Sequence, residues 1–491
     1  MGILLSNRPS EISITEKIMK AAVSNENLGE AMLKLFLSHS SGTVPVTEDV
    51  VATAVMNNGC GKELFDLLLD QGLIEGVPIT QNIIMAAAGN TTNGSNMIAR
   101  ILEQNGKEYL RPFVTAELLI AAMSNSYEGL ELVKLLLSLE MDIPITTETL
   151  KAAVTHSYHA AELVELLLGH PCFNTAITTE VLQIAVGNGY DGARIIKLLL
   201  NRDSIHTPIT DEVMEAAARN SSTTGEIMAL LLAQEGASGL ITTELLKEAA
   251  KNCSHGKEVL DVLFEHRCKD MITEEVVEAA CRSSSLETLI LVLQEMSDHV
   301  QISENAMKAA VESDNAMDKL RILLQWRDNA VPISEAIVTE ALSHFDAPKM
   351  LRFLLHQWGK DVPITEEVVK SVAANWSYGE KLLPLLFDHR GQDVPVTEEV
   401  IIAAAGNGSR AHNLIAILLD ERGNDLPITE NVLKAVVRNE ENGLEVLRLL
   451  FSEQGGNIPR SEEVLKVAAE LPRHAISFFL ENHWQVHDGS P

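Results

Sequence analysis

The chain has 491 residues and a formal net charge of −31, with 69 acidic and 38 basic side chains. This acidity argues against nucleic acid as a partner, because phosphates bind to basic surfaces, and against charge-driven docking on anionic lipid. The five cysteines form no C-x-x-C pair and no Cys/His cluster with zinc spacing. We therefore expect no metal and no other cofactor. The odd number of scattered cysteines, the lack of a signal peptide and the lack of a transmembrane run predict a cytoplasmic protein.

The first residues carry a short acylation pattern. Met1-Gly2-Ile3-Leu4-Leu5-Ser6 fits the M-G-x-x-x-[ST] pattern of N-myristoylation, which would place the acyl chain on Gly2. So short a motif also arises by chance, and one acyl chain gives only marginal membrane binding. We take residues 1–13 as an N-terminal segment ahead of the repeats.

From residue 14 onward the sequence repeats itself. Two segments, 364–395 and 428–459, place their apolar, Gly, Pro and Asn positions in the same register. Most units open with an apolar residue, then Thr or Ser, then an acid. The units begin at positions 14, 46, 79, 114, 145, 177, 209, 241, 272, 302, 333, 364, 396, 428 and 460. The last unit has Arg460 in place of the apolar residue. A period of this size is typical of stacked arrays. We predict one continuous array over residues 14–487 and a tail at 488–491.

One unit shows the expected local structure. Thr429 is a helix N-cap, the apolar residues that follow have helical spacing, and Asn439 ends this first helix. A second helix begins at Gly443, Gly455 suits a left-handed C-cap, and Pro459 stops the unit. Helices of about 9 to 12 residues are unstable alone, so both neighbours must cover their apolar faces. We predict an all-α fold, an α-solenoid of about 15 helix–loop–helix repeats of about 32 residues.

The acidity has a local explanation. Roughly 20 of the 69 acids follow the opening Thr or Ser, where a first helical turn stabilises carboxylates. The charge is thus better explained by helix starts and solubility than by attraction of a ligand.

An asparagine recurs at the end of the first helix. It occurs in ten units, as Asn25, Asn57, Asn90, Asn125, Asn188, Asn220, Asn252, Asn375, Asn407 and Asn439. Asn tolerates left-handed backbone and can bond the local backbone or the neighbouring unit, which favours a structural role over a ligand role.

Aromatic residues gather in the loop between the two helices. Four of the five tyrosines lie in this loop, namely Tyr127, Tyr158, Tyr190 and Tyr378. Trp376 lies two residues before Tyr378. The first three hold one position in three consecutive units, so stacking should align them along one edge. They are candidate binding anchors, and packing of Tyr on Tyr between repeats is the alternative. The nearby His156, His159 and His255 have no metal motif around them and are interpreted as surface residues.

Three parts of the array depart from the pattern. Units 9 to 11 (272–363) are shortened, have Ser283, Ser313 and His344 in place of the Asn, and lack the loop Gly. We interpret these departures as repeat decay that preserves packing. A change in superhelical curvature or a binding pocket is the alternative. The third unit carries the insertion NGKEYLRPF, which predicts a bulged turn. The closing unit, with Pro472, Phe478, Phe479 and Trp484, is interpreted as a cap.

The repeat resembles known families. GLEVLRLLFSEQGGNIP (443–459) and GLELVKLLLSLEMDIP (129–144) are similar to the second helix and turn of ankyrin repeats, without their Thr-Pro-Leu-His opening. The PITEEVV…AAAGN half resembles a fungal repeat found near ankyrin arrays and downstream of nucleotide-binding STAND or NACHT-type receptor modules. The resemblance implies a recognition or scaffold surface in a fungal protein and no catalytic residues. The chain has no G-x-x-x-x-G-K-[ST] loop.

Two functions follow as hypotheses. The first is a non-catalytic scaffold that binds a protein or peptide along one edge or groove of the superhelix. The alternative is an enzyme or a binder of a small apolar molecule that uses an apolar cavity inside a strongly curved or closed superhelix. No nucleophile elbow, phosphate loop or metal motif supports catalysis, which favours the scaffold.

The predicted unit has a direct spectroscopic test. We expect a far-UV circular dichroism spectrum dominated by helix, with negligible strand. A strand content above about a tenth would contradict the helix–loop–helix unit, since ordinary globular proteins contain about a quarter.

Overall fold

The computed structural model describes residues 13–39, 44–71, 78–139, 143–201, 208–220, 225–266, 268–326, 331, 333–454 and 458–459. Throughout these residues the regular structure is helical and no strand is present, which confirms the all-α prediction. By its internal contacts the chain forms two compact units, Met1–Leu245 with Asp261–His266 and Leu246–Leu260 with Arg267–Pro491. Gly2, Gly455 and the closing unit from residue 460 lie outside the described residues.

Helix pairs follow one another through the first compact unit. Their first helices are α2 (Glu16–Val23), α4 (Glu48–Met56), α6 (Gln81–Gly89), α9 (Ala116–Met123), α11 (Thr147–Thr155), α13 (Thr179–Gly187) and α15 (Asp211–Arg219). Their second helices, in the same order, are α3 (Gly29–His39), α5 (Gly61–Asp70), α7 (Gly94–Asn105), α10 (Gly129–Leu137), α12 (Ala160–Gly169), α14 (Gly192–Leu200) and α16 (Glu226–Leu232). The short turn η2 (Ala237–Leu240) comes next, and the boundary between the compact units falls within α17 (Thr243–Lys251) and α18 (Gly256–Phe264).

The second compact unit has the same organisation. After η3 (Lys269–Met271), its first helices are α19 (Glu274–Arg282), α21 (Glu304–Glu312), α23 (Glu335–Ser343), α25 (Glu366–Ala374), α27 (Glu398–Ala405) and α29 (Glu430–Arg438). Their second helices are α20 (Leu286–Glu295), α22 (Ala316–Trp326), α24 (Ala347–Trp358), α26 (Gly379–Arg390), α28 (Ala411–Arg422) and α30 (Gly443–Gln454). The 3-10 turns in this part are η4 (Gly359–Asp361), η5 (Gly391–Asp393), η6 (Gly408–Arg410) and η7 (Gly423–Asp425).

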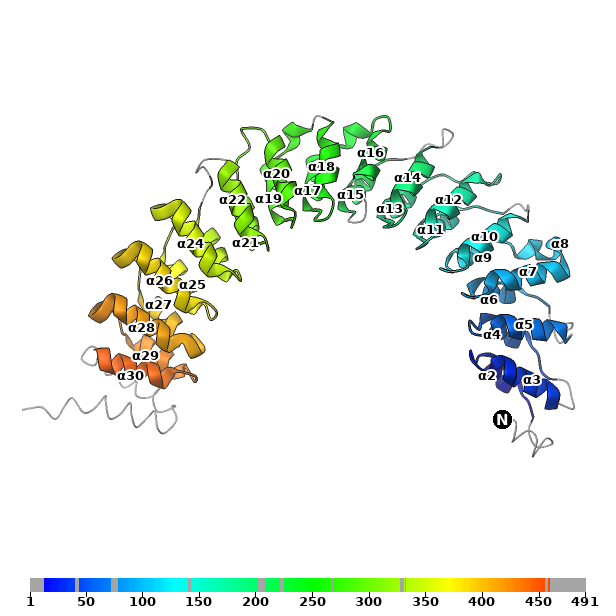
Figure 1. Cartoon of the computed structure of the whole chain (residues 1–491), viewed down its shortest axis with the longest axis horizontal. Helices are drawn as coiled ribbons and strands as arrows, with labels where there is room; N and C mark the ends of the chain where they lie inside the picture. The colour runs from blue at the N-terminus through cyan, green and yellow to red at the C-terminus, as the bar shows by residue number, and fades with distance from the viewer. Residues whose placement is uncertain are drawn as a thin grey trace, which may run out of the picture. The chain divides into compact units, whose positions relative to one another are not determined.

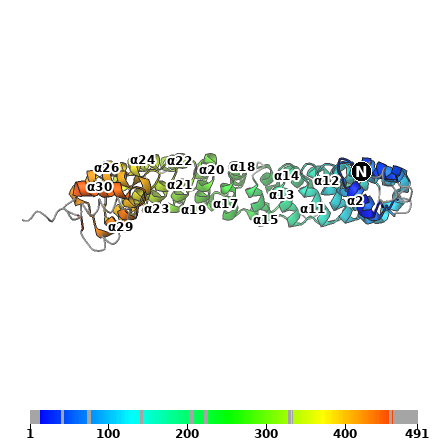
Figure 2. The same ribbon diagram turned by 90° about the horizontal axis from the view of Figure 1, so that it is seen from below.

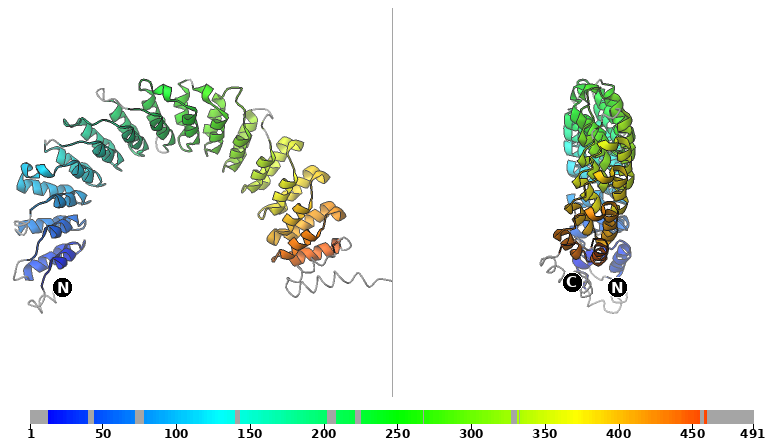
Figure 3. Two further views of the ribbon diagram at one scale, coloured as in Figure 1. Left: turned by 180° about the vertical axis from the view of Figure 1, so that it is seen from behind. Right: turned by 90° about the vertical axis from the view of Figure 1, so that its left-hand side faces the viewer.

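Within each compact unit the first helices form one row and the second helices form another. First helices pack on first helices, as α9 packs on α11 and α11 on α13, and second helices pack on second helices, as α10 packs on α12 and α12 on α14 (Figure 1). The view from below again separates α12 and α14 from α11, α13 and α15 (Figure 2), and the view from behind shows one pair repeating after another (Figure 3). Each pair is therefore covered by the pairs before and after it, as short helices with wide apolar faces require.

The apolar positions of the repeat form the core. In the last described pair Leu433 and Val436 of α29 and Leu447 of α30 have no exposed surface. Gly443 opens α30 because the two helices approach closely there: a Cβ on it would lie 2.3 Å from the carbonyl oxygen of Val436. Even the departing pairs around α19 to α24 keep this core, so substitutions in them preserved packing.

The helix starts explain much of the acidity. As expected, Thr429 caps α29 by accepting the N–H of Val432 at 3.3 Å. Its hydroxyl also donates to Oε1 of Glu398, in the first turn of the preceding first helix, at 2.8 Å. The same bond joins Thr47 to Glu16, Thr80 to Glu48 and Thr397 to Glu366. The Thr429 hydroxyl lowers the pKa of Glu398. Each of these four acids is hydrogen-bonded to the capping threonine of the next first helix.

One local expectation is wrong, and the left-handed cap expected at Gly455 is not tested, because that residue lies outside the described residues. The insertion in the third unit is not a bulged turn: it forms the short helix α8 (Lys107–Leu110) and the 3-10 turn η1 (Arg111–Phe113). Glycines that end second helices do have positive φ, since Gly359, Gly391 and Gly423 all have φ of 53°. Their ψ values, from −121° to −129°, lie outside the left-handed helical region expected of such a cap.

The recurring asparagine joins successive pairs. The Nδ2 group of Asn90 donates to the carbonyl oxygens of Val55 at 2.8 Å and of Asn57 at 3.0 Å, both in the preceding pair. Its Oδ1 accepts the backbone N–H groups of Thr92 at 3.0 Å and Asn93 at 2.9 Å in its own loop. The bond to the preceding pair recurs at Asn57, Asn125, Asn188, Asn220, Asn375, Asn407 and Asn439. One amide thus shapes a loop and ties it to its neighbour. We call the residue at this position of each pair the ladder residue, and the series of these residues the ladder.

The backbone of this asparagine is not left-handed. Asn90 has φ of −71° and ψ of 115°, and Asn57 and Asn188 are nearly the same. The tolerance of Asn for left-handed backbone is therefore not used here, while the structural role with a bond to the neighbouring unit is confirmed. The amide's hydrogen-bonding capacity, rather than its tolerance of positive φ, explains its presence.

At three junctions another side chain replaces the asparagine. The Nε2 atoms of His156 and His344 contact the carbonyl oxygens of Asn125 and Ser313, both at 3.3 Å. Ser313 is too short to reach back, and the fully buried Lys319 of α22 donates instead to the carbonyl oxygens of Cys281 at 2.7 Å and Ser283 at 2.6 Å. Burial lowers the pKa of Lys319. At these three junctions the carbonyls of the preceding pair are therefore paired without the asparagine.

Replacing a ladder amide should open its loop. We expect Asn90→Ala to lower the local free energy of opening by at least about 2 kcal/mol, because buried carbonyls and N–H groups lose their partners. Hydrogen exchange at the amides of Thr92 and Asn93 measures this directly.

The matched control is Asn90→His, which should retain most of the protection, since His156 makes equivalent bonds in this chain. Equal exchange in the alanine variant and the native chain would show that the ladder is dispensable.

Candidate binding edge

Three tyrosines occupy equivalent loop positions in the first compact unit. The backbone N–H of Tyr127 donates to Oδ1 of Asn125 at 3.2 Å, and that of Tyr190 to Oδ1 of Asn188 at 3.1 Å. The N–H of Tyr158 donates to Nδ1 of His156 at 3.2 Å. Each tyrosine therefore lies two residues after a ladder residue, in a loop with the same hydrogen-bonding pattern.

The tyrosine rings point away from the core. Tyr127 is 79% exposed, Tyr158 62% and Tyr190 80%, although large aromatic side chains are mostly buried in folded proteins. The rings of Tyr158 and Tyr190 are 6.3 Å apart between centroids and tilted by 39°, and within the described residues no such ring contact joins Tyr127 to Tyr158. Packing between repeats therefore covers little of these side chains.

The loops are bonded on a second side as well. Helices α7 and α12 have no side-chain cap of their own. Glu128, next to Tyr127, accepts the N–H of Ser95 in the first turn of α7 at 3.2 Å, and Asp191, next to Tyr190, accepts the N–H of Ala161 in α12 at 3.4 Å. The loops thus cap the second helices of the preceding pairs, and the tyrosines stand on a fixed backbone.

The second compact unit carries a separate aromatic group. Trp376 is 78% exposed in the loop after α25, whereas Tyr378 is half-buried and precedes the first residue of α26. Phe345, which was not expected as an anchor, is 61% exposed and holds the position of Trp376 one pair earlier. Its ring lies 4.2 Å from that of His344. An aromatic residue directly after the ladder position is the signal that could have found it.

His156 is not a surface residue. Only 4% of its surface is exposed. Burial lowers the pKa of His156, whereas the bond to the Asn125 carbonyl acts to raise it. The expectation of a scattered surface histidine was wrong here because the side chain occupies the ladder position. His159 and His255 are half-buried in the same type of loop.

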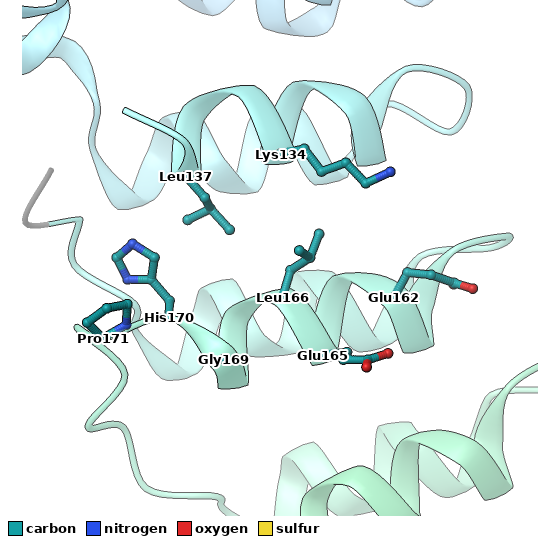
Figure 4. A pocket seen from close by; sticks show the side chains of 8 residues that line it. All are labelled: Lys134, Leu137, Glu162, Glu165, Leu166, Gly169, His170 and Pro171. Carbon is teal, nitrogen blue, oxygen red and sulfur yellow. The ribbon is translucent and has the colours of Figure 1, made fainter. Parts of the chain in front are cut away.

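Shallow grooves lie between neighbouring second helices. One, of about 460 Å³, separates α10 from α12, and Leu137 and Leu166 point toward each other across it (Figure 4). The carboxylates on its α12 side, Glu162 and Glu165, are both bound by Arg194, at 2.8 Å and 3.2 Å. Another of about 390 Å³ lies between α28 and α30. Neither groove includes the exposed tyrosines.

Thiol chemistry is divided between exposed and buried sites. Cys253 is exposed, and the N–H of Ser284, one pair further on, lowers its pKa by bonding the thiolate. Cys281 is buried, and desolvation raises its pKa to about 12.

Across the described ranges no group of three or more His, Cys, Asp or Glu residues could hold a metal ion. No helix in the same ranges has the length and apolar character needed to cross a bilayer.

Comparison with known proteins identifies the repeat. Nine segments of about 30 residues match the family described as a domain of unknown function, DUF7104, at 3–32, 35–64, 67–97, 198–228, 230–259, 262–285, 353–382, 385–412 and 417–446, more than half of the chain. The chain belongs to this family. No curated protein matches it. In this DUF7104 repeat protein the loop tyrosines Tyr127, Tyr158 and Tyr190 lie between the third and fourth matched segments.

The two thiols should differ in reactivity. Iodoacetamide attacks the thiolate, so at pH 7.5 we expect Cys253 to be alkylated at least about tenfold faster than Cys281. Peptide mass spectrometry over a time course measures both rates in one sample, and Cys253→Ser should leave the slow rate at Cys281 unchanged. Equal rates would mean that α19 opens as readily as the exposed loop.

Proposed function

We propose that this repeat protein is a non-catalytic scaffold that binds a protein or peptide through the exposed tyrosines of its loops. The observation that carries the proposal is the exposure of Tyr127, Tyr158 and Tyr190 at one position of three consecutive pairs. Aromatic residues of this kind supply much of the energy of protein interfaces, because they bury a large area with few rotatable bonds. The fungal and ankyrin-like resemblance of the repeat is compatible with such a role.

The fixed backbone of these loops favours binding. Each loop is bonded to its ladder residue, and two of them also cap the preceding second helix through Glu128 and Asp191. A surface already held in its binding conformation loses less entropy when a partner docks. Trp376 and Tyr378, with Phe345, would form a second set of anchors in the second compact unit.

The location of the tyrosines supports an edge rather than a cavity. The rings stand outside the grooves between helices. A flexible peptide or a protein surface can cover residues spaced one repeat apart, whereas a small apolar molecule cannot contact all three. The net charge of −31 disfavours a polyanionic partner.

The triple variant Tyr127→Ala, Tyr158→Ala and Tyr190→Ala tests the proposal. Peptides selected on the native protein from a displayed random library should lose at least about 30-fold in affinity, equivalent to about 2 kcal/mol, because the anchors are gone. The melting temperature should change little, since exposed substitutions cost under about 0.5 kcal/mol each. Titration calorimetry and thermal melts measure the two quantities.

The matched control is Leu28→Ala with Met56→Ala, which removes two exposed apolar side chains of the same unit outside the tyrosine loops. It should bind the selected peptides normally. Normal binding by the triple variant, or an early melt that reveals a packing role, would refute the anchors.

A further inference from the structure

His156 holds the loop of Tyr158 in a way that requires a neutral ring. Its Nδ1 accepts two backbone N–H groups, from Tyr158 at 3.2 Å and from His159 at 3.1 Å. Its Nε2 faces the carbonyl oxygen of Asn125 at 3.3 Å, which can only accept. The proton of the neutral imidazole must therefore reside on Nε2, and Nδ1 must be free of a proton.

Protonation would break this arrangement. A proton on Nδ1 would point at the two N–H groups that now donate to it, so both would lose their acceptor. In the ten asparagine units the corresponding Oδ1 atom has no proton to gain at physiological pH, so the loop is insensitive to pH. In the tyrosine row, formed by Tyr127, Tyr158 and Tyr190, the ladder residues are Asn125, His156 and Asn188, and of these three only His156 has a titratable atom.

Within the described residues no carboxylate forms an ion pair with His156. The carboxylates that the surrounding elements bring, on Glu128, Asp191 and Glu162, bond Ser95, Ala161 and Arg194 instead. On α11 itself, Lys151 pairs with Glu148 and Glu180. The ring of His159 lies 5.8 Å from that of His156 and repels a second positive charge.

We propose that His156 is a pH switch for the binding edge, in which protonation releases the loop of Tyr158 and weakens binding through the tyrosine row. The effect on binding rests on the proposed function, whereas the release of the loop does not. Tyr158 is the middle tyrosine and contacts Tyr190. Release of its loop therefore disturbs the row at its centre.

The sign and range of the effect follow from linkage. Burial lowers the pKa of His156 in the folded loop, so the open loop binds a proton more readily than the closed one. The stability of the closed loop is fully present above the ordinary histidine pKa of about 6.5 and is lost as pH falls below it toward the folded pKa. At pH 5.5 the opening equilibrium should rise by up to about tenfold.

Hydrogen exchange at the amides of Tyr158 and His159 tests the switch without a partner. After correction for the intrinsic pH dependence of exchange, opening in the native chain should increase severalfold, up to about tenfold, between pH 7.5 and pH 5.5. His156→Asn restores the residue used in ten other units and should remove the increase. His159→Asn, which changes the second histidine of the same loop, should retain it.

The proposal would be overturned if opening of the loop in the native chain did not depend on pH. It would also be overturned if opening in His156→Asn depended on pH as much as in the native chain. Loss of the effect in His159→Asn would overturn it as well. A second readout is the affinity for a peptide that depends on the tyrosine row, which should fall severalfold between pH 7.5 and pH 5.5 in the native chain and stay constant in His156→Asn. If no peptide depends on the row, the proposed function fails, and the exchange result still decides the switch.

Discussion

The bond from one side chain at the end of each first helix to the backbone of the preceding pair is the interaction on which this structure depends. At Asn90 a single amide satisfies two carbonyls of the preceding pair and two N–H groups of its own loop. Buried backbone groups that lack partners are costly, so a side chain that pairs them stabilises the junction. Helix packing brings the pairs together, and the ladder residue sets how each loop leaves its helix.

The departing repeats show that the interaction matters more than the residue. His156 and His344 reproduce the bonds with ring nitrogens, and Lys319 supplies the donor from the second helix where Ser313 cannot reach. Repeats can therefore lose the asparagine and keep the packing. This freedom also has functional consequences, because a histidine at the junction adds a titrating group that an amide lacks.

The binding edge depends on the same bonds. The loops that carry Tyr127, Tyr158 and Tyr190 are short and polar, and their shape comes from the ladder side chain rather than from burial of the loop itself. The tyrosine rings can then remain exposed without loosening the backbone. A rigid frame that presents aromatic side chains in a row is well suited to recognition, since little order has to be gained on binding.

The repeat pattern by itself determined the helix pairs, the caps at residues such as Thr429 and the position of the tyrosines in one loop, because these depend on local periodicity and capping. Only the tertiary structure showed that the asparagine backbone is extended, that His156 is buried and that Lys319 replaces a missing amide. These depend on atoms from a neighbouring pair, about 30 residues away in sequence. Lys319 holds the position in α22 that the apolar Val446 holds in α30, which can be seen in the sequence. Its partners, the carbonyls of Cys281 and Ser283, become apparent only when the pairs are stacked.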